Sequence, residues 1–151
     1  LSDLWRTFLR PRFPQVKMLV LNQDNGPENH SRRTQFLKRI VEFTVEHTLM
    51  VRLAYYPPYH SKYNPVERGF GVLENHWNGV LLDEVETALK FAESMTWKGK
   101  HPIVQLVTTV YQTGVRLTHA AMKEVEKHVQ RLPTLGKWFV DIVPPALAVD
   151  T

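Results

Sequence analysis

The first third of the chain alternates between two short apolar runs and one amphipathic stretch. Residues 16–22 (VKMLVLN) and 50–56 (MVRLAYY) are nearly continuous apolar runs between turn-forming residues, which is typical of buried strands. Residues 31–47 predict a helix, because apolar side chains recur there at helical spacing: Phe36, Leu37, Ile40, Val41 and Phe43. A strand, a helix and a strand in this order predict a βαβ unit with two parallel strands.

The remaining patterns are mostly helical. Residues 1–10 (LSDLWRTFLR) predict a helix that the segment PRFP (11–14) stops. Residues 65–79 predict a helix with Asn64 as its cap, Pro65 in its first position and one apolar face: Val66, Phe70, Leu73 and Trp77. We expect three further helices near residues 84–94, 102–113 and 119–131, and a short closing strand at 137–142 (KWFVDI).

Composition narrows the class of protein. The 151 residues suit one domain with a real core, and 43% hydrophobic with 23% charged residues is ordinary for a soluble globular protein. The absence of cysteine excludes disulfides and thiolate zinc sites, and no apolar run is long enough to span a bilayer. Residues 1–82 hold 11 Lys/Arg and 7 Asp/Glu, whereas residues 83–151 hold 8 of each. This basic half indicates either an ordinary soluble surface or a polyanionic partner such as nucleic acid.

Two acids stand where a metal ion is commonly held. Asp24 follows the end of the first predicted strand, and ligands gather at the carboxyl ends of strands in open α/β sheets. Glu67 lies in the first turn of the helix that begins at Pro65. Two carboxylates in a basic cleft suit Mg²⁺ or Mn²⁺. The alternatives are structural: Asp24 as a turn residue, and Glu67 as the third-position partner of Asn64 in a capping box.

Glycines inside the Glu67 helix add a further signal. Gly69 and Gly71 each cost about 1 kcal/mol relative to alanine in a helix interior. Gly71 lies one turn beyond Glu67 and leaves that face bare, which allows a bulky backbone such as DNA to approach. Close packing of another element against the helix explains the glycines equally well.

The two acidic segments carry a resemblance to a known family. DNGPEN (24–29) and PPYHSKYNPVER (57–68) resemble the second and third acidic motifs of DDE transposases and retroviral-type integrases, with acids 43 positions apart. MTWKGKHP (95–102) resembles a segment of the Rhodopirellula-type DDE domain of insertion-sequence transposases. The resemblance implies a bacterial cytoplasmic, nucleoid-associated protein that acts on transposon ends and target DNA, self-associates on DNA and has no membrane association.

That resemblance implies an α/β, RNase H-like fold, with a partial catalytic core at 1–82 and a mainly helical C-terminal extension at 83–151. It implies that Asp24 and Glu67 are two of three metal-binding catalytic acids, with Asn64 and Arg68 beside the site and Lys62 and Tyr63 near the DNA. The reaction would be hydrolysis at the transposon end, followed by attack of the freed 3′-hydroxyl on target DNA.

The first acid of the family has no counterpart in the expected place. It belongs on an early strand of an antiparallel set, and only 23 residues precede Asp24. Asp3 is the other acid in that stretch, and it falls in a predicted helix. We therefore expect an incomplete RNase H-like domain that lacks the first strands and is inactive as an isolated chain. The alternative is a non-catalytic DNA-binding or assembly remnant.

Other basic segments are candidates for DNA contact. Arg32 and Arg33, followed by Lys38 and Arg39, stand near a predicted helix start and suit either phosphate contact or a solvated basic face. Trp97, Lys98 and Lys100 combine an aromatic ring with two cations, a combination that suits stacking and phosphate contact. The expected helices at 102–113 and 119–131 suit plain packing better than a helix-turn-helix, although Lys123, Lys127 and Arg131 share a face of the second.

Overall fold

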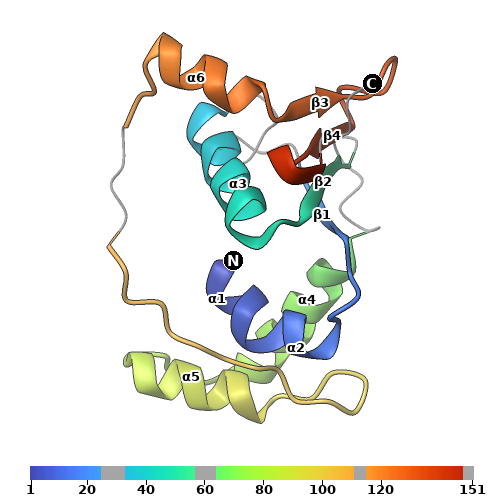
Figure 1. The fold of residues 1–151 in the computed structure, drawn as a ribbon. Coiled ribbons are helices and arrows are strands. Elements are labelled where there is room, and N and C mark those ends of the chain that lie inside the picture. The colour runs from blue at the N-terminus through green and yellow to red at the C-terminus, as the bar shows by residue number, and fades with distance from the viewer. Residues whose placement is uncertain (25–32, 57–63, 111–114, 148–151) are drawn as a thin grey trace. The chain divides into compact units, whose positions relative to one another are not determined.

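The computed structural model describes residues 1–24, 33–56, 64–110 and 115–147 (Figure 1). The chain forms two compact units. The first, called the sheet unit below, comprises Leu1–Tyr59 and Gly114–Thr151, and the second, called the hairpin unit, comprises His60–Thr113. The expected division into domains after residue 82 stays a prediction.

A four-stranded mixed sheet organises the sheet unit, with the strand order β1-β2-β4-β3. Strand β1 (Met18–Gln23) pairs in parallel with β2 (Met50–Tyr55), with Leu19 opposite Val51. Strand β4 (Phe139–Ile142) runs antiparallel to β2, and β3 (Val129–Arg131) runs antiparallel to β4. The expected parallel pairing of the first two strands is therefore confirmed, and β1 forms one edge of the sheet.

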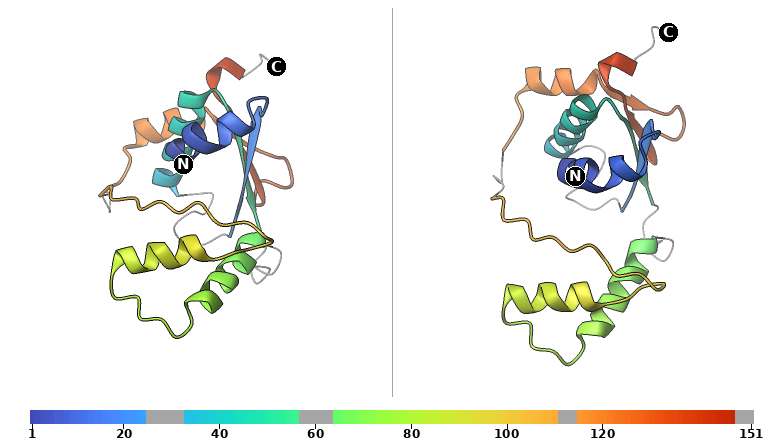
Figure 2. Two further views of the ribbon diagram at one scale, coloured as in Figure 1. Left: turned by 90° about the horizontal axis from the view of Figure 1, so that it is seen from below. Right: turned by 60° about the horizontal axis from the view of Figure 1, so that its bottom comes forward.

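Helices cover one face of this sheet (Figures 1 and 2). Helix α3 (Thr34–His47) connects β1 to β2, and α6 (His119–Glu126) packs beside it. The N-terminal helix runs through α1 (Ser2–Leu4), a π-helical segment η1 (Trp5–Leu9) and α2 (Arg10–Arg12). Its Trp5 is buried against Phe43 of α3, with ring centroids 6.4 Å apart.

The core forms because alternate strand residues point toward these helices. Val51, Leu53, Val140 and Ile142 are fully buried, and they meet apolar side chains of α3 and α6. The opposite face of the sheet carries Arg52, which donates two hydrogen bonds of 2.7 Å to Asp141 across the β2–β4 pair. These hydrogen bonds raise the pKa of the Arg52 guanidinium above its ordinary value. A polar cross-strand pair therefore joins β4 to the βαβ unit.

The described residues of the hairpin unit form two helices and a turn. Helix α4 (Pro65–Trp77) and helix α5 (Val85–Ser94) contact each other through His76. The His76 Nε2 lies 2.9 Å from Ser94 Oγ. The His76 ring also meets Phe91 edge-on, with centroids 6.0 Å apart. After α5, Trp97 and Lys100 form an isolated antiparallel bridge.

Two predicted helices are corrected. Residues 102–110, the described part of the expected helix 102–113, form no helix, in keeping with their content of helix-disfavouring β-branched side chains: Ile103, Val104, Val107, Thr108, Thr109 and Val110. The expected helix at 119–131 ends at Glu126, because Val129–Arg131 pair with β4 instead. The short closing strand is confirmed by β4, and a short 3₁₀ helix, η3 (Pro145–Leu147), follows it. Across the described ranges, no helix combines the length and the apolar character needed to cross a membrane.

Candidate metal and nucleic-acid site

Asp24 lies directly after β1, at the carboxyl end of the parallel strand pair. The backbone N–H of Tyr56 donates to the Gln23 carbonyl over 2.9 Å, which ties the last residue of β1 to the chain leaving β2. Asp24 is exposed and follows this tied end. The sheet therefore presents one carboxylate where parallel strands commonly present ligands.

Glu67 lies in the first turn of α4, and the capping of this helix decides between its two interpretations. The Asn64 side chain caps α4 by accepting a hydrogen bond of 3.3 Å from the Val66 N–H. In a full capping box, the Glu67 carboxylate would return a bond to the Asn64 N–H. Within the described ranges, the exposed Glu67 carboxylate makes no hydrogen bond and no ion pair. The helix is therefore capped without it, and its carboxylate is available to a ligand.

The donor chemistry of these two residues suits a hard divalent cation. Both offer exposed carboxylate oxygens, the ligand type that Mg²⁺ and Mn²⁺ prefer. Asp24 belongs to the sheet unit and Glu67 to the hairpin unit, so the proximity of the two carboxylates stays a prediction. Among the described residues, no group of three or more His, Cys, Asp or Glu side chains is placed to hold a metal ion.

Three cations of the hairpin unit form no ion pair with an acid in the ranges that the structure describes. Arg68, Lys98 and Lys100 are exposed and form no ion pair with a carboxylate in the described part of the chain. Lys90 of α5, by contrast, pairs with Glu86 over 2.8 Å. Unpaired cations attract phosphates more effectively than cations that a neighbouring carboxylate neutralises. The hairpin unit therefore offers Arg68, Lys98 and Lys100 as candidate phosphate contacts.

The basic segment around α3 is largely neutralised. Arg33 is the exposed N-cap residue of α3. Lys38 and Arg39 both contact Glu42, with N–O distances of 3.2 and 2.9 Å. Partial burial opposes ionisation of Glu42, but the hydrogen bonds from Arg39 and Lys38 outweigh it and lower the pKa of this carboxyl. Lys38 and Arg39 are therefore poorer phosphate contacts than the unpaired cations.

Trp97 packs inside the hairpin unit. Its half-buried ring lies against α4 at Gly69, where a methyl group would stand 3.6 Å from the ring carbon Cζ3. The sequence did not reveal this contact, and the glycine within a helix was its only signal. At Gly71 a methyl group would meet nothing within 4 Å, so this position stays open.

Some of the candidate residues are not placed by the structure. Arg32, Lys62 and Tyr63 lie outside the described residues. Their contact with DNA stays a prediction, as does stacking of Trp97 on a base.

The helix-turn-helix alternative is not supported by the described residues. Its first helix is missing from 102–110, and Arg131 lies on β3 rather than on the second helix. Lys127 pairs with Glu124 over 2.7 Å. In the described residues, the recognition face of this less favoured alternative therefore does not form.

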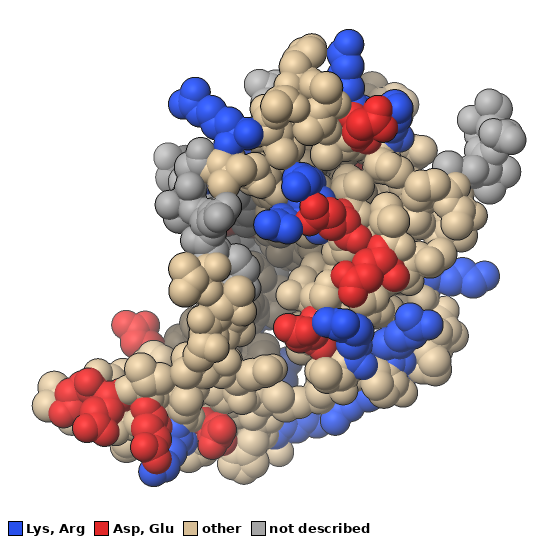
Figure 3. All heavy atoms as spheres, turned by 60° about the vertical axis from the view of Figure 1, so that its left-hand side comes forward, with Lys and Arg blue, Asp and Glu red and all other residues tan. Residues whose placement is uncertain are grey.

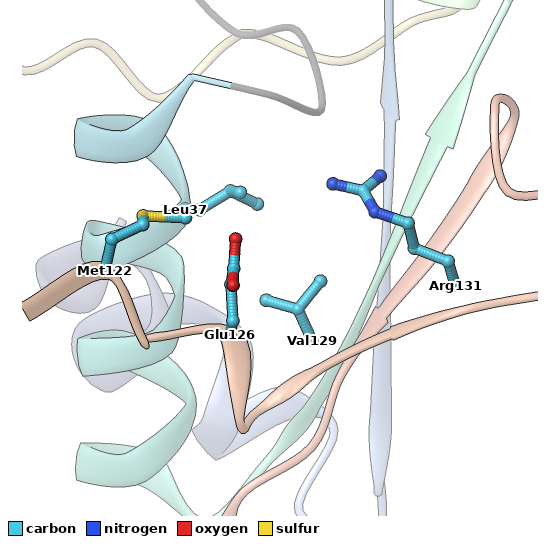
Figure 4. Close-up of a pocket in the computed structure, with 5 residues that line it drawn as sticks. All are labelled: Leu37, Met122, Glu126, Val129 and Arg131. Atoms are coloured by element: carbon cyan, nitrogen blue, oxygen red, sulfur yellow. The ribbon is translucent and has the colours of Figure 1, made fainter. Parts of the chain in front are cut away.

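A pocket of about 360 Å³ opens between α3, α6 and β3. Figure 4 shows Leu37 and Met122 on one side of it, with the Glu126 carboxylate and the Arg131 guanidinium directed into the same space. Arg131 points to the helix-covered face of the sheet, and its positive charge partly offsets the rise in the pKa of Tyr55 that burial causes. Charges of both signs at this pocket give it no clear preference for an anion.

The surface charge is mixed. On the face drawn in Figure 3, Lys and Arg side chains lie dispersed among Asp and Glu side chains rather than in one patch. On this face, a nucleic-acid interface would therefore depend on local cations rather than on one continuous basic patch.

Comparison with known proteins gives a family for this arrangement. The Rhodopirellula transposase DDE domain matches residues 1–144, which is nearly the whole chain and includes both acidic segments. Searches of the curated proteins and of the solved structures each found no match. A DDE domain implies an RNase H-like fold, which agrees with the mixed α/β sheet, and the family generally uses divalent metals and acts on DNA. The chain therefore belongs to the Rhodopirellula transposase DDE domain family and has a transposition-related function.

Proposed function

We propose that this chain serves metal-dependent DNA strand cleavage and transfer in transposition, with Asp24 and Glu67 as ligands of Mg²⁺ or Mn²⁺. The observation that carries the proposal is the Glu67 carboxylate, which is exposed in the first turn of a helix that Asn64 caps without its help. The family match adds the chemistry, because both acids fall within the matched residues.

Each named residue has a distinct part in this chemistry. Asp24 and Glu67 would hold the ions through their carboxylate oxygens, and such ions, when bound, would supply activation of the attacking hydroxyl and charge stabilisation at the leaving oxygen. Asn64 fixes the start of α4 and thereby the position of Glu67. Arg68, Lys98 and Lys100 bind phosphates of the transposon end or of the target, joined by Arg32, Arg33, Lys62 and Tyr63. Bound copies self-associate on the DNA, and the protein works in the bacterial cytoplasm at the nucleoid.

A non-catalytic DNA-binding or assembly role is the second candidate. It is favoured by the absence, among the described residues, of any cluster of three metal-binding side chains. Two carboxylates hold Mg²⁺ poorly, because the ion demands a near-octahedral oxygen shell and loses its waters reluctantly. We therefore expect the 151 residues by themselves to bind DNA without cutting or joining it.

Binding and cleavage are measured separately on the purified chain. Fluorescence anisotropy with labelled DNA at several salt concentrations should show weak binding that falls steeply as salt rises. Replacing Lys98 and Lys100 by alanine should lower the slope of log affinity against log salt by roughly 1 to 2, since each phosphate contact contributes about 0.9. Lys90→Ala is the matched control, because Lys90 lies in the same unit and is already paired with Glu86. Equal slopes for all three proteins would remove Lys98 and Lys100 from the DNA interface.

Incubation with transposon-end DNA and Mg²⁺ or Mn²⁺ separates the two candidate functions. We expect no cleavage by the isolated chain. Cleavage that disappears in both Asp24→Ala and Glu67→Ala would show a complete catalytic site within these residues and would exclude the non-catalytic role. Sedimentation of the DNA complex measures self-association.

A further inference from the structure

Residues 95–101 form a tight hairpin after α5. The Trp97 N–H donates to the Lys100 carbonyl over 2.9 Å, and the Lys100 N–H donates to the Trp97 carbonyl over 3.1 Å. Lys98 and Gly99 have φ angles of +51° and +73°, so both central residues are left-handed, as a two-residue hairpin turn requires. His101 Nδ1 closes the base of the hairpin by donating to the Met95 carbonyl over 3.0 Å.

The Trp97 ring packs the hairpin at residues 95–101 against α4, the helix that carries Glu67. The Trp97 ring lies against Gly69, where a methyl group would stand 3.6 and 3.7 Å from ring carbons Cζ3 and Cε3. Met95, at the start of the hairpin, is buried with 7% of its surface exposed. The turn therefore has a fixed base, while Lys98 at its tip and Lys100 directly after the tip are exposed.

The contact between Trp97 and Gly69 lies on the side of α4 opposite to Glu67. Gly69 follows Glu67 by two residues, which places it about 200° around a helix of 3.6 residues per turn. His76, which binds Ser94 and Phe91 of α5, follows Glu67 by nine residues and so lies about 180° around. In the described part of the hairpin unit, the Trp97 and His76 contacts thus lie on the side of α4 opposite to Glu67. The other side presents Glu67 and the open position at Gly71.

We propose that Trp97 is a positioning residue for Glu67: by packing on Gly69 it fixes the rotation of α4 about its own axis and directs the Glu67 carboxylate toward a bound divalent cation. The proposal rests on the proposed function of Glu67 as a metal ligand. A carboxylate that must share an ion with a second residue tolerates little angular error, so its helix needs a rigid support on the opposite side.

The contact at Gly69 defines matched variants. A methyl group at 3.6 Å makes ordinary van der Waals contact, so Gly69→Ala should leave the ring in place. A leucine side chain at this position requires the space that the ring fills, so Gly69→Leu should displace Trp97 while favouring the helix itself. Trp97→Phe retains an aromatic ring on the helix, and Trp97→Ala removes it.

Iron-directed cleavage of the protein backbone reports where the carboxylates hold an ion. The purified chain is loaded with Fe²⁺ and treated with ascorbate and hydrogen peroxide, so that radicals formed at the bound ion cut the chain nearby. Mass spectrometry then identifies the cuts, and excess Mg²⁺ should suppress them. The unaltered chain, Gly69→Ala and Trp97→Phe should be cut near both Asp24 and Glu67. Trp97→Ala and Gly69→Leu should lose cutting near Glu67 by roughly tenfold, the usual effect of removing a support behind a metal ligand.

Hydrogen exchange of the α4 amides separates a misdirected helix from an unfolded one. Loss of cutting near Glu67 with unchanged α4 protection supports the proposal. If Trp97→Ala unfolds α4, Gly69→Leu decides by the same two measurements. Unchanged cutting in Gly69→Leu, or loss of cutting only together with α4 protection, overturns the positioning role. Absence of cuts near Asp24 and Glu67 in the unaltered chain overturns the proposed metal site instead, so the two failures are distinguishable.

Discussion

The Arg52–Asp141 pair should contribute unequally to stability, depending on which partner is removed. Two hydrogen bonds, each 2.7 Å long, make this a bidentate pair. Its two residues lie directly opposite each other on β2 and β4. The Arg52 side chain is 32% exposed and the Asp141 side chain 12% exposed. Water can therefore solvate the Arg52 guanidinium after Asp141 is removed more readily than it can solvate the Asp141 carboxylate after Arg52 is removed.

The expected magnitudes follow from this difference in exposure. At an effective dielectric constant of about 20 and a separation of about 4 Å, the direct attraction is about 4 kcal/mol before desolvation is subtracted. Asp141→Asn keeps the shape and leaves Arg52 to water, so it should lower the free energy of unfolding by about 2 kcal/mol. Arg52→Met leaves a poorly solvated carboxylate and should lower it by about 3 kcal/mol. The double variant Arg52→Met with Asp141→Leu should recover most of the loss, because neither charge remains.

Urea unfolding followed by far-ultraviolet circular dichroism measures these free energies. Circular dichroism averages over both compact units, so hydrogen exchange of the Val51, Leu53 and Val140 amides shows whether the change lies in the sheet unit. A double-mutant cycle of Arg52→Met, Asp141→Leu and the two combined gives the coupling between the two side chains. Coupling below about 0.5 kcal/mol, or a larger loss for Asp141→Asn than for Arg52→Met, would refute the reasoning from exposure.

Three further predictions concern the core, the helix cap and the response to pH. Leu53→Ala removes a fully buried side chain from the centre of the sheet and should cost about 2–5 kcal/mol in urea unfolding, whereas Val20→Ala at the 48% exposed position on β1 should change stability by about 0.5 kcal/mol or less. Asn64→Ala removes the cap of α4 and should cost that helix about 1 kcal/mol, seen as faster exchange in its first turn and not in α5. Burial raises the pKa of the Tyr55 phenol to about 12, so absorbance at 295 nm should show a tyrosine ionisation near pH 12 that Tyr55→Phe removes. Because the unfolded chain loses this proton at its ordinary pKa, the stability of the sheet unit should fall as pH rises from about 10 to about 12, and Tyr55→Phe should remove that part of the fall.

Local sequence patterns were sufficient to predict the helices and strands that form from residues close together in the chain. The apolar runs predicted β1 and β2, and the spacing of Leu37, Ile40 and Phe43 predicted α3, because a strand or a helix must bury its apolar side wherever it lies. The parallel pairing followed from the length of the connection, which contains a helix. The two acidic segments also indicated the family before any geometry was known, and the family match confirms it.

Tertiary contacts decided the features that involve distant residues. Val129–Arg131 continued a helical pattern in the sequence, but they form a strand because β4 offers them a pairing edge and the ladder of hydrogen bonds outweighs a weak local preference. Arg52 and Asp141 are 89 residues apart, and only the register of β2 and β4 makes them partners. The sequence likewise left the glycine at position 69 open to two explanations, and the ring of Trp97 against it supports the packing one. The sequence determined which segments can form helices and strands, because backbone preference and apolar spacing are local properties. The structure determined which side chains meet, because that depends on how separated segments share one surface.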